Sequence, residues 1–311
     1  MAAVIAGIVF VSSPVAAHDS PDHVVEALSV EMARTGTNAS LLWQRATEYR
    51  ALGRLAPAAK DLQHALSLDP RFILAWSDLA RVQLNRNRAS EALASINRAL
   101  ELAGDEGSRA PLRMVRAEVE NALGRPDAAL ADCERALSTG TAPEADWFLA
   151  RGQLQLRLGR YAEAAAGLKK GFDQTGSAVL EAEWIDALID GGKYREALEL
   201  IEPRVAEARC QSSWLLRRGR ARLALGDTLR ARGDLNATIT EINGRLHRTQ
   251  PDAALLAERG LAAALLGDAA AARRDLASAR RLEVDEATLL RLEVALRRAS
   301  ANEKSRAEAR P

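Results

Sequence analysis

Residues that could carry catalytic chemistry are scarce in this sequence of 311 residues. It contains no glycine-rich phosphate loop, no HExxH zinc motif and no nucleophile beside a candidate base. Cys133 occupies a helix position where the equivalent residues are leucine and isoleucine, so we expect it in the core. Cys210 should lie beyond the ~7 Å Cα limit for a disulfide with it. The sequence therefore predicts a protein that is not an enzyme and needs no cofactor.

Metal-ligating residues are equally sparse. His64 and His247 have no second histidine or cysteine at metal-ligand spacing, so we expect both on the surface. Donors gather in the segment HDSPDH, where His18, Asp19, His23 and a free amine could hold a metal ion if the mature chain began there. A flexible end without supporting hydrogen bonds makes a poor site. A metal-binding accessory role is therefore a minor alternative.

The composition predicts close-packed helices. The sequence is 48% hydrophobic but only 4% aromatic, so its core must consist mainly of alanine and leucine. Lysine and arginine number 43 against 42 aspartate and glutamate, which leaves no net field to attract nucleic acid or an anionic membrane surface. We expect no nucleic-acid partner.

A residue that favours a left-handed turn recurs at intervals of 33 to 41 residues. Its seven occurrences are Gly53, Asn87, Gly124, Gly159, Gly192, Gly226 and Gly267. Five residues after each turn stands an alanine, namely Ala58, Ala92, Ala129, Ala164, Ala197, Ala231 and Ala272. Another small residue usually stands seven positions before the turn. These spacings place small side chains on the facing sides of two antiparallel helices, which can then approach closely.

This pattern resembles the tetratricopeptide repeat. In the first unit the matching residues are Ala46, Tyr49, Gly53, Ala58, Leu62, Ala65 and Pro70. In the second unit they are Trp76, Leu79, Ala80, Ala92, Ile96 and Ala99. The resemblance implies an all-α protein, an α-solenoid wound as a right-handed superhelix of about seven helix–turn–helix units.

The repeat divides the chain into five segments. Residues 1–17 would form a signal peptide, 18–38 an amino-terminal segment with a short capping helix, and 39–282 the repeat array. A second capping helix is expected over 283–299, followed by a disordered tail over 300–311. Both caps are needed because a repeat of this kind cannot bury its apolar face alone.

The first helix of each unit carries a second stripe, beside the one that faces its partner helix. In tetratricopeptide repeat proteins this stripe lines the concave groove that binds peptides. The residues we expect there, with Asn85 adjoining, are Trp43, Arg50, Arg81, Asn85, Glu118, Asn121, Gln153, Asp186 and Arg220. The family's lysine and asparagine clamp for a terminal carboxylate is not supported, because Trp43 and Thr47 stand at those positions.

Two interpretations of the charges in the stripe stay open. Arg81 could simply pair with Glu118, and Asp186 with Arg220, across neighbouring units, each pair contributing about 0–1 kcal/mol if exposed. Alternatively, alternating charges between apolar flanks suit an extended polypeptide. The sequence thus predicts a scaffold or adaptor with a protein or peptide partner. The alternative is a structural scaffold that self-associates through its edges, and the sequence does not predict the oligomeric state.

The first seventeen residues, MAAVIAGIVFVSSPVAA, are uncharged and include an apolar run from Ala2 to Val11. Val15 and Ala17 supply the small residues that a signal peptidase requires, so the mature chain should begin at His18. The segment would contact the membrane only if it stayed uncleaved, and it is short for spanning about 30 Å. We expect export to the bacterial cell envelope, in the periplasm.

Intact-mass measurement on protein from an envelope fraction should show the loss of residues 1–17. The expectation rests on the small-residue pair that follows the apolar run. Recovery of the full-length chain from the membrane would instead establish an uncleaved anchor.

Overall fold

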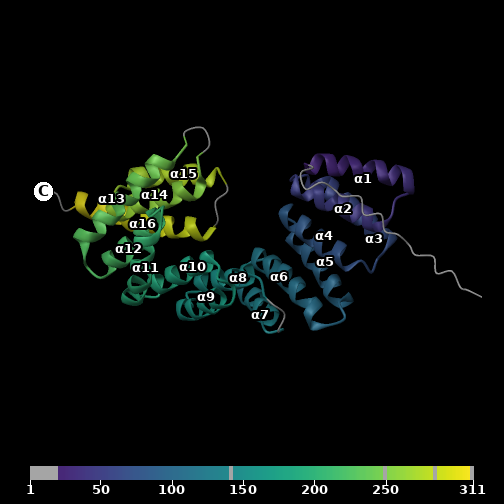
Figure 1. Ribbon diagram of the computed structural model, residues 1–311, viewed down its shortest axis with the longest axis horizontal. Coiled ribbons are helices and arrows are strands. Elements are labelled where there is room, and N and C mark those ends of the chain that lie inside the picture. Colours follow the sequence, from purple (N-terminus) through teal and green to yellow (C-terminus); the bar gives the residue numbers. More distant parts are fainter. Residues whose placement is uncertain (1–19, 140–142, 248–250, 283–285, 309–311) are drawn as a thin grey trace, which may run out of the picture. The chain divides into compact units, whose positions relative to one another are not determined.

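The computed structural model describes residues 20–139, 143–247, 251–282 and 286–308. Within these ranges the chain forms sixteen α-helices and no strand, which confirms the predicted all-α fold. It divides into two compact units, Met1–Ala142 and Pro143–Pro311. Within each unit successive helices pack against one another in chain order (Figure 1).

The two units differ in length but are built in the same way. The first unit contains α1 (Pro21–Thr35), α2 (Ala39–Ala51), α3 (Leu55–Leu68), α4 (Ile73–Asn85), α5 (Ala89–Leu102), α6 (Glu106–Ala122) and α7 (Pro126–Leu137). The second contains α8 (Ala145–Arg157), α9 (Tyr161–Thr175), α10 (Ala178–Asp190), α11 (Tyr194–Glu207), α12 (Ser212–Ala224), α13 (Thr228–Arg245), α14 (Ala253–Leu266), α15 (Ala269–Arg280) and α16 (Glu286–Glu308).

Every predicted turn residue adopts the left-handed backbone that the sequence pattern requires. The φ angles of the seven residues range from 59° at Asn87 to 91° at Gly267. At the first turn, the Gly53 N–H donates to the Arg50 carbonyl at 3.0 Å, and the Arg54 N–H donates to the Tyr49 carbonyl at 2.8 Å. Glycine and asparagine recur here because they reach this conformation at low steric cost.

The predicted close contact between the paired helices of a repeat is present in six of the seven repeats, and it is looser between α10 and α11, where Ile185 replaces the small residue before the turn. All seven alanines that follow the turns are completely buried, at 0% exposure. Opposite them, a Cβ added to Gly152 would lie 2.6 Å from a methyl carbon of Leu168. A Cβ added to Gly219 would lie 3.0 Å from a methyl carbon of Leu235. The helices are therefore as close as their side chains permit.

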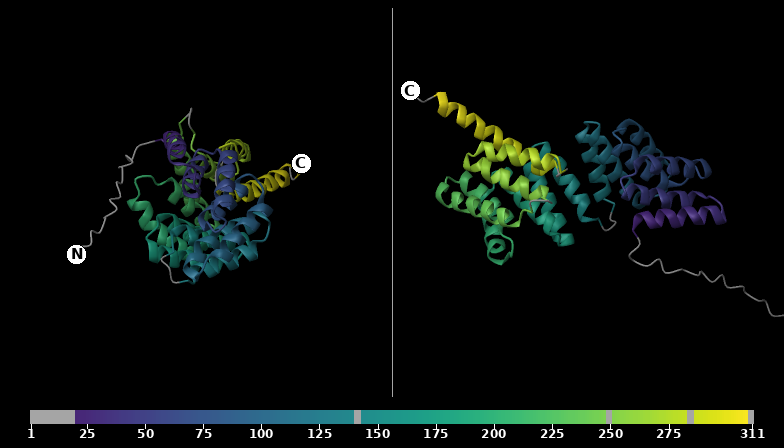
Figure 2. Two further views of the ribbon diagram at one scale, coloured as in Figure 1. Left: turned by 90° about the vertical axis from the view of Figure 1, so that its right-hand side faces the viewer. Right: turned by 90° about the horizontal axis from the view of Figure 1, so that it is seen from above.

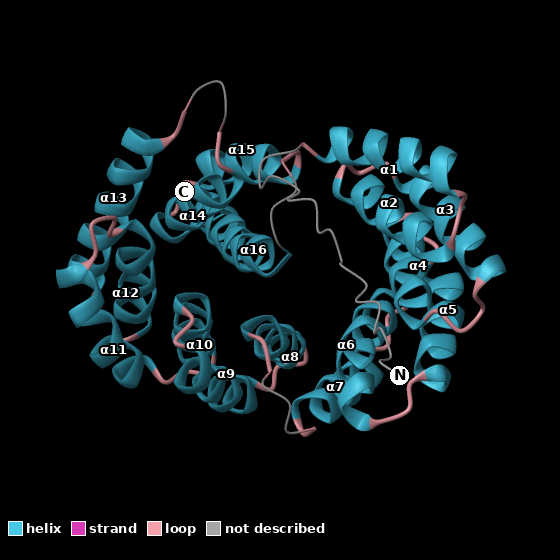
Figure 3. Ribbon diagram, turned by 45° about the vertical axis from the view of Figure 1, so that its right-hand side comes forward, coloured by secondary structure: helices cyan, strands magenta, loops and turns pink. Residues whose placement is uncertain are grey.

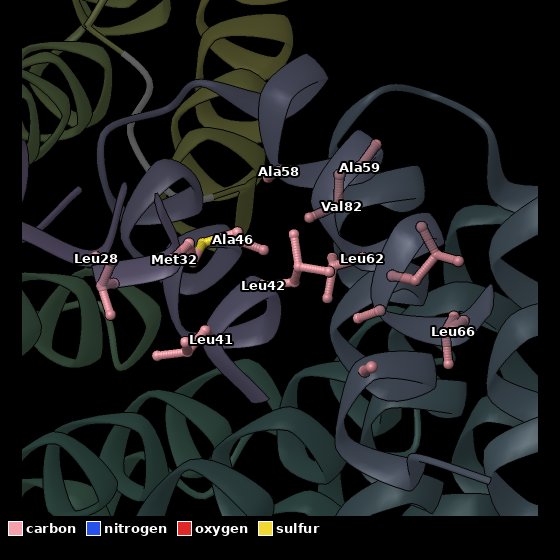
Figure 4. Packing of buried hydrophobic residues seen from close by; sticks show 13 residues of the cluster. Leu28, Met32, Leu41, Leu42, Ala46, Ala58, Ala59, Leu62, Leu66 and Val82 are labelled. Atoms are coloured by element: carbon pink, nitrogen blue, oxygen red, sulfur yellow. The ribbon is translucent and has the colours of Figure 1, made fainter. Parts of the chain in front are cut away.

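The amino-terminal helix α1 covers the apolar end of the first unit. It begins at Pro21 and ends before Gly36, whose φ is 93°. Leu28 and Met32 of α1 belong to one buried cluster with Leu42 of α2 (Figure 4). This packing removes from water the face that a terminal repeat would otherwise expose.

The carboxyl-terminal helix is longer than the sequence predicted. We expected helix to 299 and a disordered tail after it, but α16 continues to Glu308. Residues 300–308 contain several good helix formers and no glycine or proline, so nothing in them ends the helix. Leu292 of α16 is fully buried and lies against Gly260 of α14. Figure 2 shows α16, in yellow, crossing the green helices of the second unit.

The close helix contact predicts the effect of adding volume at one alanine. Ala197 of α11 is completely buried, so Ala197→Leu should lower the free energy of unfolding by about 1–3 kcal/mol, because the extra methylenes force the helices apart. Denaturant unfolding of parent and variant measures this difference. Ala206→Leu, at an exposed position of the same helix, is the control and should leave the midpoint within about 0.5 kcal/mol of the parent. Equal midpoints for both variants would contradict the packing described here.

Candidate protein-binding surfaces

In the first unit, α2, α4 and α6 line the inner side, and α3, α5 and α7 lie on the outer side (Figure 3). The predicted stripe lies on the three inner helices. Its residues are Trp43 and Arg50 of α2, Arg81 and Asn85 of α4, and Glu118 and Asn121 of α6. Asn85 and Glu118 are exposed, and the other four are half-buried.

One end of this inner side is organised by a carboxylate that the sequence analysis did not single out. The indole nitrogen of Trp43 donates to Oδ2 of Asp78 at 2.7 Å. Arg50 lies 3.9 Å from the other oxygen of the same carboxylate. The Trp43 ring also packs against Phe72, with ring centroids 5.7 Å apart. Trp43 is therefore held in place with part of its ring still open to solvent.

Farther along the inner side, two cations lie near a carboxylate. Glu118 is exposed to water, yet the surrounding protein excludes part of its hydration shell and so raises its pKa. Arg81 and Arg50 oppose this effect through their positive charges. Arg81 has no ion pair within 4.0 Å among the residues that the structure describes. The expected Arg81–Glu118 pair is thus only a longer-range attraction, and both groups can still contact a ligand.

In the second unit, the predicted stripe residues Asp186 and Arg220 belong to a cluster of ion pairs. Asp186 of α10 is almost fully buried, at 2% exposure. It accepts a hydrogen bond from Arg217 at 2.8 Å and pairs with Arg220, both of α12. Burial alone would raise the pKa of Asp186, but Arg217, Arg291 and Arg220 together hold it well below its ordinary value. The predicted pairing of Asp186 with Arg220 is present, as part of a larger buried cluster.

The third arginine of this cluster comes from α16. Arg291 lies 3.0 Å from Glu183, 3.5 Å from Asp186 and 3.4 Å from Asp190, all on α10. Burial alone would lower the pKa of Arg291, but the three carboxylates raise it well above its ordinary value. Arg291 thereby ties α16 to the inner side of α10. The groove that the sequence predicted over Asp186 and Arg220 is covered there by the chain's own last helix.

Sequence reasoning missed Arg291, although its partners carry a readable signal. Glu183, Asp186 and Asp190 are spaced by three and four residues, which puts three carboxylates on one face of α10. Three neighbouring carboxylates require cations nearby. Arg217 and Arg220 of α12, in the next repeat, supply only part of the compensating charge. The remaining predicted residue, Gln153 of α8, is half-buried and lies beside a cavity bounded by α16.

The sequence analysis also missed an arginine–aspartate pair that recurs within four of the helix–turn–helix repeats. An arginine eight residues before the turn forms a two-pronged hydrogen bond with an aspartate eight residues after it. The four pairs are Arg45–Asp61, Arg116–Asp132, Arg218–Asp234 and Arg259–Asp275. In each pair the aspartate is buried, with 4–6% of its surface exposed. The equal spacing of sixteen residues was visible in the sequence and marks these arginines as structural.

The structure places both cysteines and one of the histidines that the sequence analysis considered. Cys133 is buried and Cys210 is exposed, and no disulfide joins them. His64 lies on α3 at a cleft between α1, α2 and α3. No group of three or more histidine, cysteine, aspartate or glutamate side chains within the described ranges could hold a metal ion. His18 and Asp19, with the proposed signal segment, lie outside the described residues.

No helix of the described part of the chain is long and apolar enough to cross a membrane. The expected cleaved signal peptide, and its alternative of an uncleaved anchor, concern residues 1–17, which the structure does not describe.

Comparison with known proteins connects these features to a family. The family model for the tetratricopeptide repeat matches residues 44–108 and 113–170. Protein FlbA of Caulobacter vibrioides is 34% identical over 116 residues, which are 37% of this chain and 19% of that protein. The chain therefore spans only a small part of that relative's length.

Solved structures share the fold. A tetratricopeptide repeat protein from Parabacteroides merdae aligns with a TM-score of 0.60 and 19% identity, covering 83% of this chain and 98% of that chain. The pilF protein of Pseudomonas aeruginosa aligns with a TM-score of 0.52 and 18% identity, covering 70% of this chain and 92% of that chain. The likeness at these identities concerns the arrangement of helices.

The buried cluster predicts how the stability of the protein depends on pH. Asp186→Asn should lower the free energy of unfolding by about 3–5 kcal/mol at pH 7, because it removes the buried carboxylate that Arg217, Arg220 and Arg291 share. The pKa of Asp186 is lower in the folded than in the unfolded chain, so its stabilisation is present above the unfolded pKa of about 3.9 and is lost as the pH falls below that value. The difference between parent and variant should therefore shrink in acid.

Urea unfolding over a series of pH values measures both effects. Asp173→Asn is the matched control, since Asp173 pairs with Lys169 on the exposed surface of α9. It should change the free energy of unfolding by less than about 1 kcal/mol. A similarly small effect of Asp186→Asn would show that the cluster does not stabilise the fold.

Proposed function

Since this chain is a tetratricopeptide repeat protein, we propose that it is a non-catalytic scaffold that binds a polypeptide along the inner side of its first unit. Repeat proteins of this fold serve protein interaction in general. The observation that carries the proposal is the contrast between the two units. Asp186 and Arg220 are covered by α16, whereas the first unit keeps Arg81 and Glu118 accessible to a ligand.

The polypeptide that suits this surface is extended and of mixed chemistry. Arg81 and Arg50 would attract an acidic side chain or backbone carbonyls, and Glu118 would attract a basic side chain or backbone N–H groups. The open part of the Trp43 ring, and Leu84 on α4, offer apolar contact area beside these charges. Alternating charged and apolar contacts fix both the direction and the register of an extended segment.

We further propose that the scaffold acts in the cell envelope, most plainly in the periplasm. The uncharged, apolar start of the sequence and the small residues before His18 support export. An envelope extract is therefore the source in which a partner should be sought. Light scattering that finds concentration-dependent association of the pure protein would instead favour a self-associating scaffold.

Arg81→Glu should weaken capture of the envelope partner at least about tenfold, equivalent to roughly 1.4 kcal/mol, because it reverses a charge that the ligand contacts. The protein is immobilised, exposed to an envelope extract, and the captured polypeptides are quantified by mass spectrometry. Affinity for each captured polypeptide is then measured with purified components. Folding should change little, since Arg81 has no close ion pair to lose in the described part of the chain.

Arg98→Glu provides the matched control on the outer side of the same unit. Arg98 lies on α5, is exposed and, among the residues that the structure describes, forms an ion pair only with Glu101 one turn away. It should leave capture unchanged. The proposal fails if Arg81→Glu and Arg98→Glu both hold the partner as tightly as the parent.

A further inference from the structure

A cavity of about 670 Å³ lies in the second unit, between α16 and the turn ends of the inner helices α8, α10, α12 and α14. Its volume falls within the range of about 300–1,000 Å³ that is usual for ligand pockets. Residues of α16 form one wall of the cavity. The cavity is separate from the surface of the first unit to which the proposed function belongs.

One part of the lining is aliphatic. Leu261 and Leu265 of α14 line the cavity from the inner side, and Leu290 and Val294 line it from α16. Leu290 keeps 40% of its surface exposed and Val294 keeps 37%, although both lie beside other apolar groups. A ligand with aliphatic side chains would remove this surface from water, which favours binding.

The charges that line the cavity are unbalanced. Arg220 and Arg291 are neutralised by the carboxylates of α10, of which Asp190 reaches the cavity. Arg232 of α13 and Arg298 of α16 also line it, and both are exposed. Neither has an ion pair within the described residues. The cavity therefore presents two available cations and favours an anionic ligand.

Neutral hydrogen-bonding groups complete the lining. Gln153, Tyr161 and Tyr194 face the cavity, and their side-chain polar groups have no hydrogen-bond partner in the part of the chain that the structure describes. They come from three different helices, α8, α9 and α11. Separate donors and acceptors along a wall match the regular amides of a peptide better than the single polar end of a fatty acid.

We propose that this cavity is a second ligand site, which binds a short acidic peptide segment with aliphatic side chains. The aliphatic side chains pack between α14 and α16, and the carboxylates pair with Arg232 and Arg298. Helix α16 thus contributes directly to binding, and the site exists only while Arg291 holds that helix against α10. Every residue that lines this site belongs to the second unit, and Arg81 is not among them.

The test uses the full chain and a fluorescein-labelled peptide in which leucine and glutamate alternate, followed by fluorescence anisotropy. We expect saturable binding that Arg232→Glu and Arg298→Glu each weaken at least about tenfold, because each reverses a charge beside the ligand. Arg230→Glu is the matched control: it makes the same change on the same helix, at a residue that is 74% exposed and does not line the cavity. Arg230→Glu and Arg81→Glu should both bind as the parent does.

Comparison ligands decide between alternatives. A peptide that alternates leucine and lysine should not bind, and dodecanoate should not displace the probe at concentrations below its micelle formation. No saturable binding of the acidic peptide, equal weakening by Arg230→Glu, or displacement by dodecanoate would each overturn the proposal. Thermal unfolding of every variant confirms that a loss of binding does not reflect a loss of fold.

Discussion

The close approach of the two antiparallel helices of a helix–turn–helix repeat is the contact on which the rest of this structure depends. It requires a small residue on each side, and the alanines that follow the turns have no exposed surface. Because the helices lie so close, an aspartate, whose side chain is short, can reach an arginine on the paired helix. The Arg45–Asp61 pair, at 2.7 Å, and its three counterparts therefore exist only where the helix contact exists. Van der Waals packing and charge pairing thus specify the same register between the helices.

The spacing of residues a few positions apart made the repeat predictable. The same spacing could not reveal contacts between helices that are far apart in the sequence. The left-handed turns and buried alanines follow from residues a few positions apart, so they could be read from one chain. The contact of Arg291 with Glu183 joins residues separated by 108 positions, and no local sequence pattern on α16 predicts this contact. The extent of α16 was also missed, because a polar segment with good helix propensity has the same composition in a tail as in a helix.

The candidate surface shows the same division between what spacing predicts and what packing decides. Equivalent positions of the repeat hold Arg81 in the first unit and Asp186 in the second, and their spacing places both on the inner side. Arg81 remains partly exposed to solvent, whereas Asp186 is buried in a cluster of arginines. The difference depends on whether another helix covers the position, which is a tertiary property. Asp78, which accepts a hydrogen bond from Trp43, was likewise outside the predicted stripe, although it lies three residues before Arg81 on α4.

The contact between Arg291 and α10 also has a consequence for the order in which the chain folds. The two helices of a repeat are joined by contacts between residues about sixteen positions apart. Each pair can therefore form soon after its own segment has left the ribosome. Helix α16 is synthesised more than a hundred residues after α10 begins, and its contact with α10 closes a loop of that length. Throughout synthesis of the second unit, the carboxylates of α10 therefore remain without Arg291. Until α16 has been synthesised, Glu183 lacks the guanidinium that it contacts in the folded chain, whereas Asp186 and Asp190 can already pair with arginines of α12.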